Sequence, residues 1–88
     1  DAEDRYVYLV KKDGSKFIVD YRLSDLEKIL NPEIFFRLNR SFIAHFDSIH
    51  SMIKVSKSRI KIELLPVTKR EIIISSESSQ EFKLWLNR

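Results

Sequence analysis

The segment Ile34–Phe46 constrains the fold of this chain most strongly, because large apolar side chains make up most of it. Such side chains are buried on folding, so the backbone of this segment is expected to be anchored. Arg37, Asn39, Arg40 and Ser41 interrupt the apolar run, and an anchored backbone holds polar side chains at fixed positions. Arginine and asparagine read base edges, and serine hydroxyls contact phosphates. The segment predicts a small DNA-binding domain with Asn39 and Arg40 at its rim. That prediction fails if both turn inward and bond only to the protein.

Short strand-like runs separated by turn residues continue over much of the chain. Tyr6–Val10 is aromatic and β-branched, Lys16–Tyr21 is its expected partner, and the Asp-Gly pair in Lys12–Ser15 predicts a tight hairpin between them. Further strands are expected in the runs Phe35–Leu38, Ser41–Phe46, Ile49–Val55, Ser58–Leu64 and Ile72–Ile74. A second hairpin is expected around residues 56–58, and residues 60–64 alternate apolar and charged side chains with a period of two.

Two short helices are expected. In the first, Ser24 and Glu27 have the spacing of a capping box, leucines follow at helical intervals, and Asn31-Pro32 ends the helix. In the second, near the carboxyl end, Ser78 and Glu81 repeat that spacing. Helical spacing there places Phe82, Trp85 and Leu86 on one side, which predicts core packing and not base stacking. The fold class is mainly β, an antiparallel multi-sheet domain with two short helices.

Length and composition limit the remaining possibilities. The 88 residues suit one domain with one apolar core, and the absence of cysteine fits a reducing cytoplasm. No apolar run approaches the length of a membrane span, so no membrane contact is expected from this segment. Residues 35–70 hold eight lysines and arginines against two acidic residues, a net charge of +6. Such asymmetry favours a polyanion-binding face, although a solvated charged face is the commoner explanation of a charge bias alone.

Catalysis, metal binding and cofactors find no support in the sequence. His45 and His50 are expected on opposite faces of a strand, with no cysteine or carboxylate cluster to complete a metal site. The single glycine excludes a glycine-rich phosphate-binding loop. The serines at 75, 76, 78 and 79 suit the entry to a helix better than a catalytic triad. We therefore expect no enzymatic activity, no metal and no cofactor.

A family resemblance rests on several of these residues. The order Leu-x-x-Leu, Pro-x-x-Phe-Phe-Arg-Leu-Asn-Arg-Ser-Phe-Ile, Ile49, a basic hairpin and Glu-Phe-Lys-x-Trp-Leu resembles the LytTR-type DNA-binding domain. The resemblance covers nearly the whole chain and is most specific between Phe35 and Ile49. It implies an elongated β fold that presents loop side chains to successive grooves of double-stranded DNA without a recognition helix. It also implies sequence-specific binding, in the output domain of a bacterial two-component response regulator.

The resemblance carries specific site residues. The groove-contacting pair of the family falls on Asn39 and Arg40, followed by Ser41, and Asn39 stands where many members have histidine. An earlier contact falls near Arg5. A third contact, often an arginine in the family, falls on Ser76, where a phosphate hydrogen bond is the expected remnant.

Other basic residues are candidates for phosphate contacts. Arg37 lies two positions before Asn39, so strand alternation could point both to one face, and an intramolecular partner such as Asp47 is the alternative. Lys57 shares a strand face with Arg59 and Lys61, a stripe that more often keeps a sheet soluble. The last candidates precede the final strand, namely Lys69 and Arg70.

The expected partners extend beyond these 88 residues. The abrupt start at Asp1 and the small size suggest one domain cut from a longer protein with an upstream receiver or sensor domain. The resemblance implies that the first strand or two of the family is missing. Homodimerisation on paired DNA sites is implied by the resemblance. Two rival functions remain open, a single-stranded nucleic-acid binder that stacks bases on Tyr6, Tyr8 and Tyr21, and a β-rich protein-interaction module.

Overall fold

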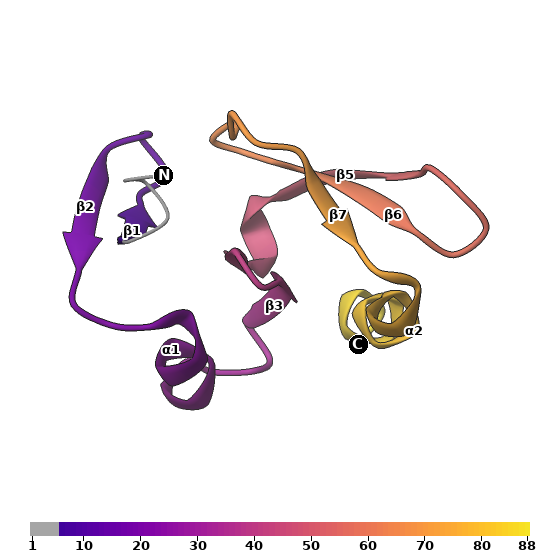
Figure 1. The fold of residues 1–88 in the computed structure, drawn as a ribbon, viewed down its shortest axis with the longest axis horizontal. Coiled ribbons are helices and arrows are strands. Elements are labelled where there is room, and N and C mark those ends of the chain that lie inside the picture. Colours follow the sequence, from indigo (N-terminus) through magenta and orange to yellow (C-terminus); the bar gives the residue numbers. More distant parts are fainter. Residues whose placement is uncertain (1–5) are drawn as a thin grey trace.

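The fold is built from three small antiparallel sheets and two helices, in a computed structural model that describes residues 6–88 (Figure 1). The mainly β class with two short helices is confirmed. The elements are β1 (Val7–Val10), β2 (Lys16–Val19), α1 (Leu23–Ile29), β3 (Phe35–Asn39), β4 (Phe42–His45), the 3-10 turn η2 (Phe46–Ser48), β5 (Ile49–Lys54), β6 (Ile60–Leu64), β7 (Ile72–Ile74) and α2 (Ser76–Leu86).

The first sheet is the predicted hairpin of β1 and β2. Gly14 adopts a φ of +91°, which residues with a Cβ rarely adopt, and its N–H donates to the carbonyl of Lys11 at 2.9 Å. The Asp13 carboxylate accepts the N–H of Ser15 at 2.9 Å and the Ser15 hydroxyl at 2.6 Å. The Asp-Gly pair therefore forms the turn expected of it.

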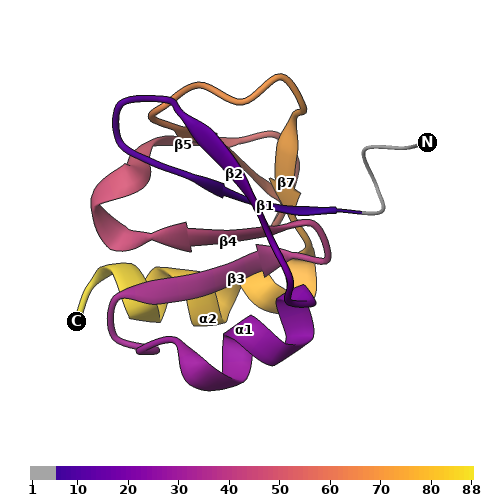
Figure 2. The ribbon, with the colours of Figure 1, turned by 90° about the vertical axis from the view of Figure 1, so that its left-hand side faces the viewer.

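The other two sheets form the body of the molecule. β3 pairs with β4, and the register shifts between Arg37 and Asn39. The third sheet has the order β5-β6-β7, and the hairpin of β5 and β6 closes through residues 55–59 as predicted. Both helices lie on the same side of the sheets (Figure 2). The molecule measures 35 × 25 × 24 Å.

The core lies between the third sheet, β3, β4 and α2. Its buried members are Leu38, Ala44, Ile60, Ile62, Ile72, Ile74, Phe82 and Trp85. The period-two isoleucines of β6 all face this core, as their alternation predicts. Phe82 and Trp85 are buried as predicted, and the Trp85 indole N–H donates to the Pro32 carbonyl at 2.9 Å. Three phenylalanines, at positions 36, 42 and 46, pack against the cluster.

Both predicted capping boxes are wrong. Helix α1 begins at Leu23 after Arg22, without a side-chain cap, so Ser24 already lies inside its first turn. The Glu27 carboxylate points to Arg37 and not back to the helix start. In α2 the cap is Ser75, whose hydroxyl accepts the N–H of Ser78 at 3.4 Å. The four serines nevertheless lie at the entry of this helix, as expected.

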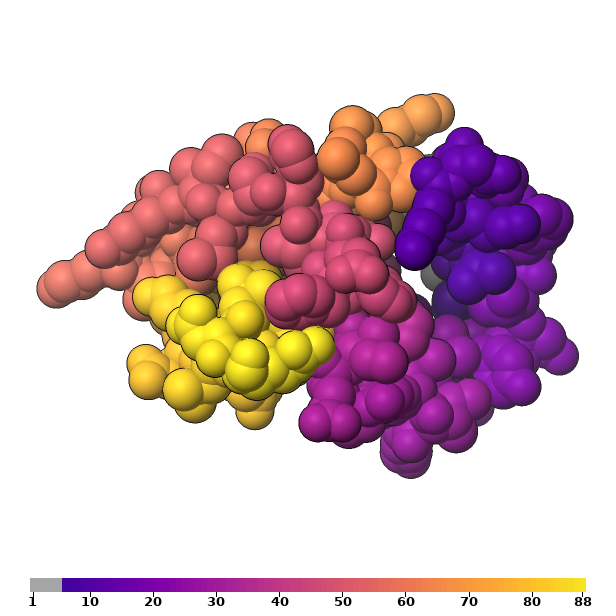
Figure 3. Space-filling view, turned by 180° about the vertical axis from the view of Figure 1, so that it is seen from behind, coloured from indigo at the N-terminus to yellow at the C-terminus, as the bar shows by residue number. Residues whose placement is uncertain are grey.

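The hairpin of β1 and β2 lies beside the packed body (Figure 3). Its apolar side chains remain largely in solvent, with Leu9 53%, Phe17 51% and Ile18 61% exposed. Figure 1 places this hairpin at one end of the long axis and the tip of the β5–β6 hairpin at the other. The two ends therefore flank the central β3–β4 hairpin.

Candidate nucleic-acid interface

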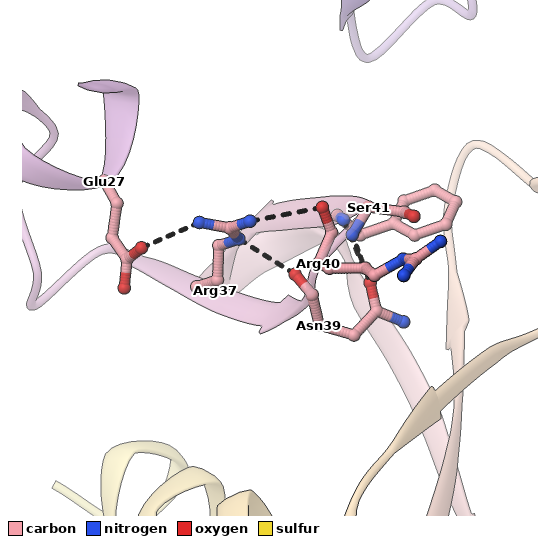
Figure 4. A network of polar contacts seen from close by, with 6 residues as sticks. Glu27, Arg37, Asn39, Arg40 and Ser41 are labelled. Carbon is pink, nitrogen blue, oxygen red and sulfur yellow. Dashed lines mark hydrogen bonds and ion pairs between the residues drawn. The ribbon is translucent and has the colours of Figure 1, made fainter. Parts of the chain in front are cut away.

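The Arg37 guanidinium holds the turn between β3 and β4 (Figure 4). The Arg37 Nε donates to the carbonyl of Asn39 at 2.9 Å, and its Nη2 donates to the carbonyl of Arg40 at 3.1 Å. Its Nη1 forms an ion pair with Glu27 Oε1 of helix α1 at 2.9 Å. The intramolecular partner of Arg37 is therefore Glu27, not the Asp47 considered from the sequence.

The Asn39 side chain holds the same turn from the other side. Its Oδ1 accepts the N–H groups of Ser41 at 2.8 Å and Phe42 at 3.1 Å. Its Nδ2 donates to the carbonyl of Ile73 in β7 at 3.3 Å. Asn39 is therefore turned toward the protein and not outward at the rim. Its predicted contact with a base stays a prediction.

Arg40 is exposed at the apex of this turn. Within residues 6–88 its guanidinium makes no hydrogen bond or ion pair, while its carbonyl is held by Arg37. The backbone that carries Arg40 is thus fixed and its charged group is open to solvent. Of the two residues expected at the rim, Arg40 alone has that placement.

A second loop brings positive charge to the same place. Arg70, in the segment between β6 and β7, donates from Nη2 to the Ser41 hydroxyl at 3.0 Å, and its guanidinium carbon lies 5.6 Å from the centre of the Phe42 ring. Lys69, its neighbour, is exposed. The fold therefore gathers four predicted site residues into one surface, here called the turn surface: Arg40, Ser41, Lys69 and Arg70.

The remaining predicted residues lie elsewhere. Lys57 is at the tip of the β5–β6 hairpin, at the opposite end of β6 from the loop of Lys69. Ser76 is exposed at the first position of α2, immediately beyond β7. Arg5 lies outside the described residues. The predicted basic stripe on one strand face is wrong, because Lys57 and Arg59 precede β6. Lys61 lies on β6 and pairs with Glu71 at 3.7 Å, so this lysine is partly neutralised.

Metal binding finds no matching cluster of side chains in the part of the chain that is described. Residues 6–88 contain no group of three or more histidine and acidic side chains able to hold a metal ion. The His45 Nδ1 accepts the N–H of Asp47 at 3.0 Å and so caps η2. No helix among these residues is long and apolar enough to cross a membrane.

The contact of Glu27 with Arg37 was not predicted from the sequence. The spacing of Glu27 from Ser24 suggested a helix cap, whereas its carboxylate contacts a strand residue ten positions later. Nothing in the local pattern distinguishes these two uses of a glutamate. Only the docking of α1 beside the β3–β4 hairpin does so.

The family model of the LytTr DNA-binding domain matches residues 1–87. The chain belongs to the LytTR family of DNA-binding domains. Proteins of this family bind DNA as output domains of response regulators, so the LytTR domain described here acts in DNA binding and transcription regulation. The match spans nearly the whole chain, as the sequence resemblance predicted.

A solved structure shares the LytTR fold. The LytTr DNA-binding domain of a response regulator from Bacillus cereus superposes with a TM-score of 0.70 at 20% identity, covering 97% of this chain and 84% of that one. The comparison with curated proteins gave no match. The three tyrosines considered for base stacking are partly accessible: Tyr6 and Tyr21 are exposed and Tyr8 is half-buried. The family match nevertheless does not favour single-stranded nucleic-acid binding or a protein-interaction module.

Proposed function

We propose that this LytTR domain reads double-stranded DNA by inserting the turn between β3 and β4 into a groove, with Arg40 as the base-contacting residue. The observation that carries the proposal is the open guanidinium of Arg40 on a backbone held by side-chain hydrogen bonds. Arginine donates two hydrogen bonds to guanine in the major groove, which discriminates against other bases by about 1–3 kcal/mol. The proposal therefore gives sequence choice to Arg40.

Phosphate contacts would surround this turn. Lys69, Arg70 and the Ser41 hydroxyl lie on the turn surface beside Arg40 and can contact the backbone on either side of the base that Arg40 reads. Lys57 and Ser76 lie further along the molecule, where they suit contacts with more distant phosphates, and Arg5 is assigned an outer contact from the family pattern. Such contacts supply affinity and salt dependence, and they add little to sequence choice.

Regulation requires parts beyond this domain. We propose an upstream receiver domain whose phosphorylation controls pairing of two copies on adjacent half-sites in the bacterial cytoplasm. The family's place in response regulators supports this arrangement. A gene that encodes no domain upstream of Asp1 would contradict it. The mass of the complex between the full-length protein and DNA, measured with and without phosphorylation, shows whether one or two copies bind and so tests the pairing.

The test of DNA reading starts with selection from a randomised duplex pool. We expect a defined sequence to emerge, and affinity for its duplex to exceed affinity for its separate strands. Affinity should fall steeply as salt rises, because each neutralised phosphate releases condensed counterions. A pool that converges on no sequence would refute sequence-specific reading. Tighter binding to single strands would favour the stacking alternative, and no binding at all would favour a protein-interaction module.

A further inference from the structure

We infer that Glu27, Arg37 and Asn39 are positioning residues, which set the sequence specificity of Arg40 without contacting DNA themselves. The inference rests on the proposed role of Arg40. It assigns to helix α1 a part in DNA reading, although α1 contributes no residue to the turn surface. In this role Arg37 and Asn39 support the turn, whereas the sequence had suggested that they contact DNA directly.

The backbone of the β3–β4 turn explains why such support is needed. Asn39 pairs with Phe42, so only Arg40 and Ser41 form the loop. Two-residue hairpin loops usually adopt turns with positive φ, which match the twist of the strands. No residue other than glycine has a positive φ in residues 6–88, and this loop contains no glycine. Its geometry therefore depends on contacts outside the two loop residues.

Arg37 supplies the first of those contacts. β3 carries an extra residue at the register shift, Leu38, whose side chain is buried in the core. The shift brings the Arg37 guanidinium under the turn, where its rigid fork binds the carbonyl groups of two successive residues. Those carbonyls belong to Asn39 and Arg40. A single arginine thus fixes the orientation of the peptide units that carry the reading residue.

Asn39 and Glu27 complete the support. The Asn39 amide binds the two N–H groups that follow Arg40 and connects the turn to β7, which also leads to the loop of Arg70. Glu27 holds the third edge of the Arg37 guanidinium, whose side chain is only 25% exposed. The turn is therefore held before DNA arrives. Such preorganisation lowers the ordering cost of binding and keeps a contact group within its productive geometry.

The decisive experiment removes Glu27, since charge and positioning predict opposite results. Glu27→Ala removes a negative charge, and by charge alone affinity for any duplex should rise. Positioning predicts that affinity for the selected duplex falls by up to about fivefold, the upper end of what a partly exposed ion pair contributes. Asp25→Ala is the matched control, because it removes a carboxylate from the same helix. An equal rise for selected and scrambled duplexes in both variants would overturn the inference.

Arg37→Lys separates positioning from phosphate contact. Lysine keeps the positive charge but cannot bind both carbonyl groups and Glu27 together. We expect the preference for the selected duplex to fall at least threefold while affinity for scrambled DNA changes little. Full retention of both affinities would show that only charge matters at this position, and would overturn the positioning role.

A measurement without DNA tests the support of the β3–β4 turn separately from the proposed DNA reading. Backbone ¹⁵N order parameters of Arg40 and Ser41 should fall in Glu27→Ala and Arg37→Lys, and those around Gly14 should not change. This result is expected even if the selection finds no preferred sequence, in which case the proposed function alone fails. Unchanged order parameters at Arg40 and Ser41 would show that the turn does not need this support.

Discussion

The turns at Asp13 and Asn39 share the same local hydrogen bond, but they differ in their contacts with other elements of the fold. In each, a side-chain oxygen accepts the N–H group two residues later, at 2.9 Å for Asp13 and 2.8 Å for Asn39. At Asp13 the other hydrogen bonds of the turn are local, and Gly14 provides the positive φ. At Asn39 the contacts reach helix α1, through Arg37, and strand β7. A local contact can shape a turn, but only contacts between elements fix that turn relative to the body.

This difference matters for DNA reading. A group that reads bases has to be held to within a fraction of an ångström of its productive position. The β3–β4 turn meets this need because it is bonded to two other elements. The β1–β2 turn is defined in shape, yet its strands lie beside the body with their apolar side chains largely exposed. Of these two turns, the β3–β4 turn is therefore the suitable carrier for a specificity residue.

The two hairpins should differ most in how much their apolar side chains contribute to the free energy of unfolding. Leu38→Ala in β3, where the side chain is 1% exposed, should lower the free energy of unfolding by about 2–5 kcal/mol. Leu9→Ala in β1, where the side chain is 53% exposed, should lower it by at most about 1 kcal/mol. Urea denaturation measures both. Equal losses would show that the first hairpin is packed as firmly as the second.

A smaller difference in the free energy of unfolding is expected between the side chains that shape the two turns, Asn39 and Asp13. Asn39→Ala removes the acceptor of two backbone N–H groups and the bond to Ile73, so a loss of about 1–2 kcal/mol in the free energy of unfolding is expected. Asp13→Ala breaks bonds only to Ser15 and should cost less. The same denaturation measurement compares them. A larger loss from Asp13→Ala would contradict the contrast between local and long-range support.

The smallest effect is the titration of Asp13. Its hydrogen bonds, first of all that from the Ser15 hydroxyl, lower the pKa of Asp13 below the ordinary 3.8. The ionised carboxylate thus adds a little stability above the unfolded-state pKa, and this is lost as pH falls through the lower folded-state pKa. Ser15→Ala should raise the pKa of Asp13 toward its ordinary value. An NMR titration of the carboxyl carbon tests this, and an unchanged pKa would exclude the hydroxyl as the main cause.

Local patterns predicted most of the fold. The Asp-Gly turn, the period-two isoleucines of β6 and the helical spacing of Phe82 and Trp85 each depend on neighbours in sequence, and each prediction is confirmed. The first residue of each helix was harder to predict. The Ser-x-x-Glu spacing occurs in both helices, but α1 begins at Leu23 without a side-chain cap, and α2 is capped by Ser75.

The candidate site was predictable as a segment and less so residue by residue. The apolar setting of residues 34–46 indicated an anchored turn, and Arg40 has the exposed position expected of it. Strand alternation suggested that Arg37 and Asn39 could point to one face of the strand, where both could contact DNA. The pairing register shifts at Leu38, and both side chains bond within the protein. The Ser41–Arg70 contact joins residues 29 positions apart, a distance that no local pattern spans.

The most direct test of the account is the effect of Arg40→Ala on two affinities, for the selected duplex and for a scrambled duplex, measured at one salt concentration. We expect affinity for the selected duplex to fall roughly tenfold to hundredfold, and affinity for the scrambled duplex to change far less. Lys69→Ala is the control and should weaken both alike. Equal losses for both duplexes in Arg40→Ala would make Arg40 a phosphate contact and contradict the account.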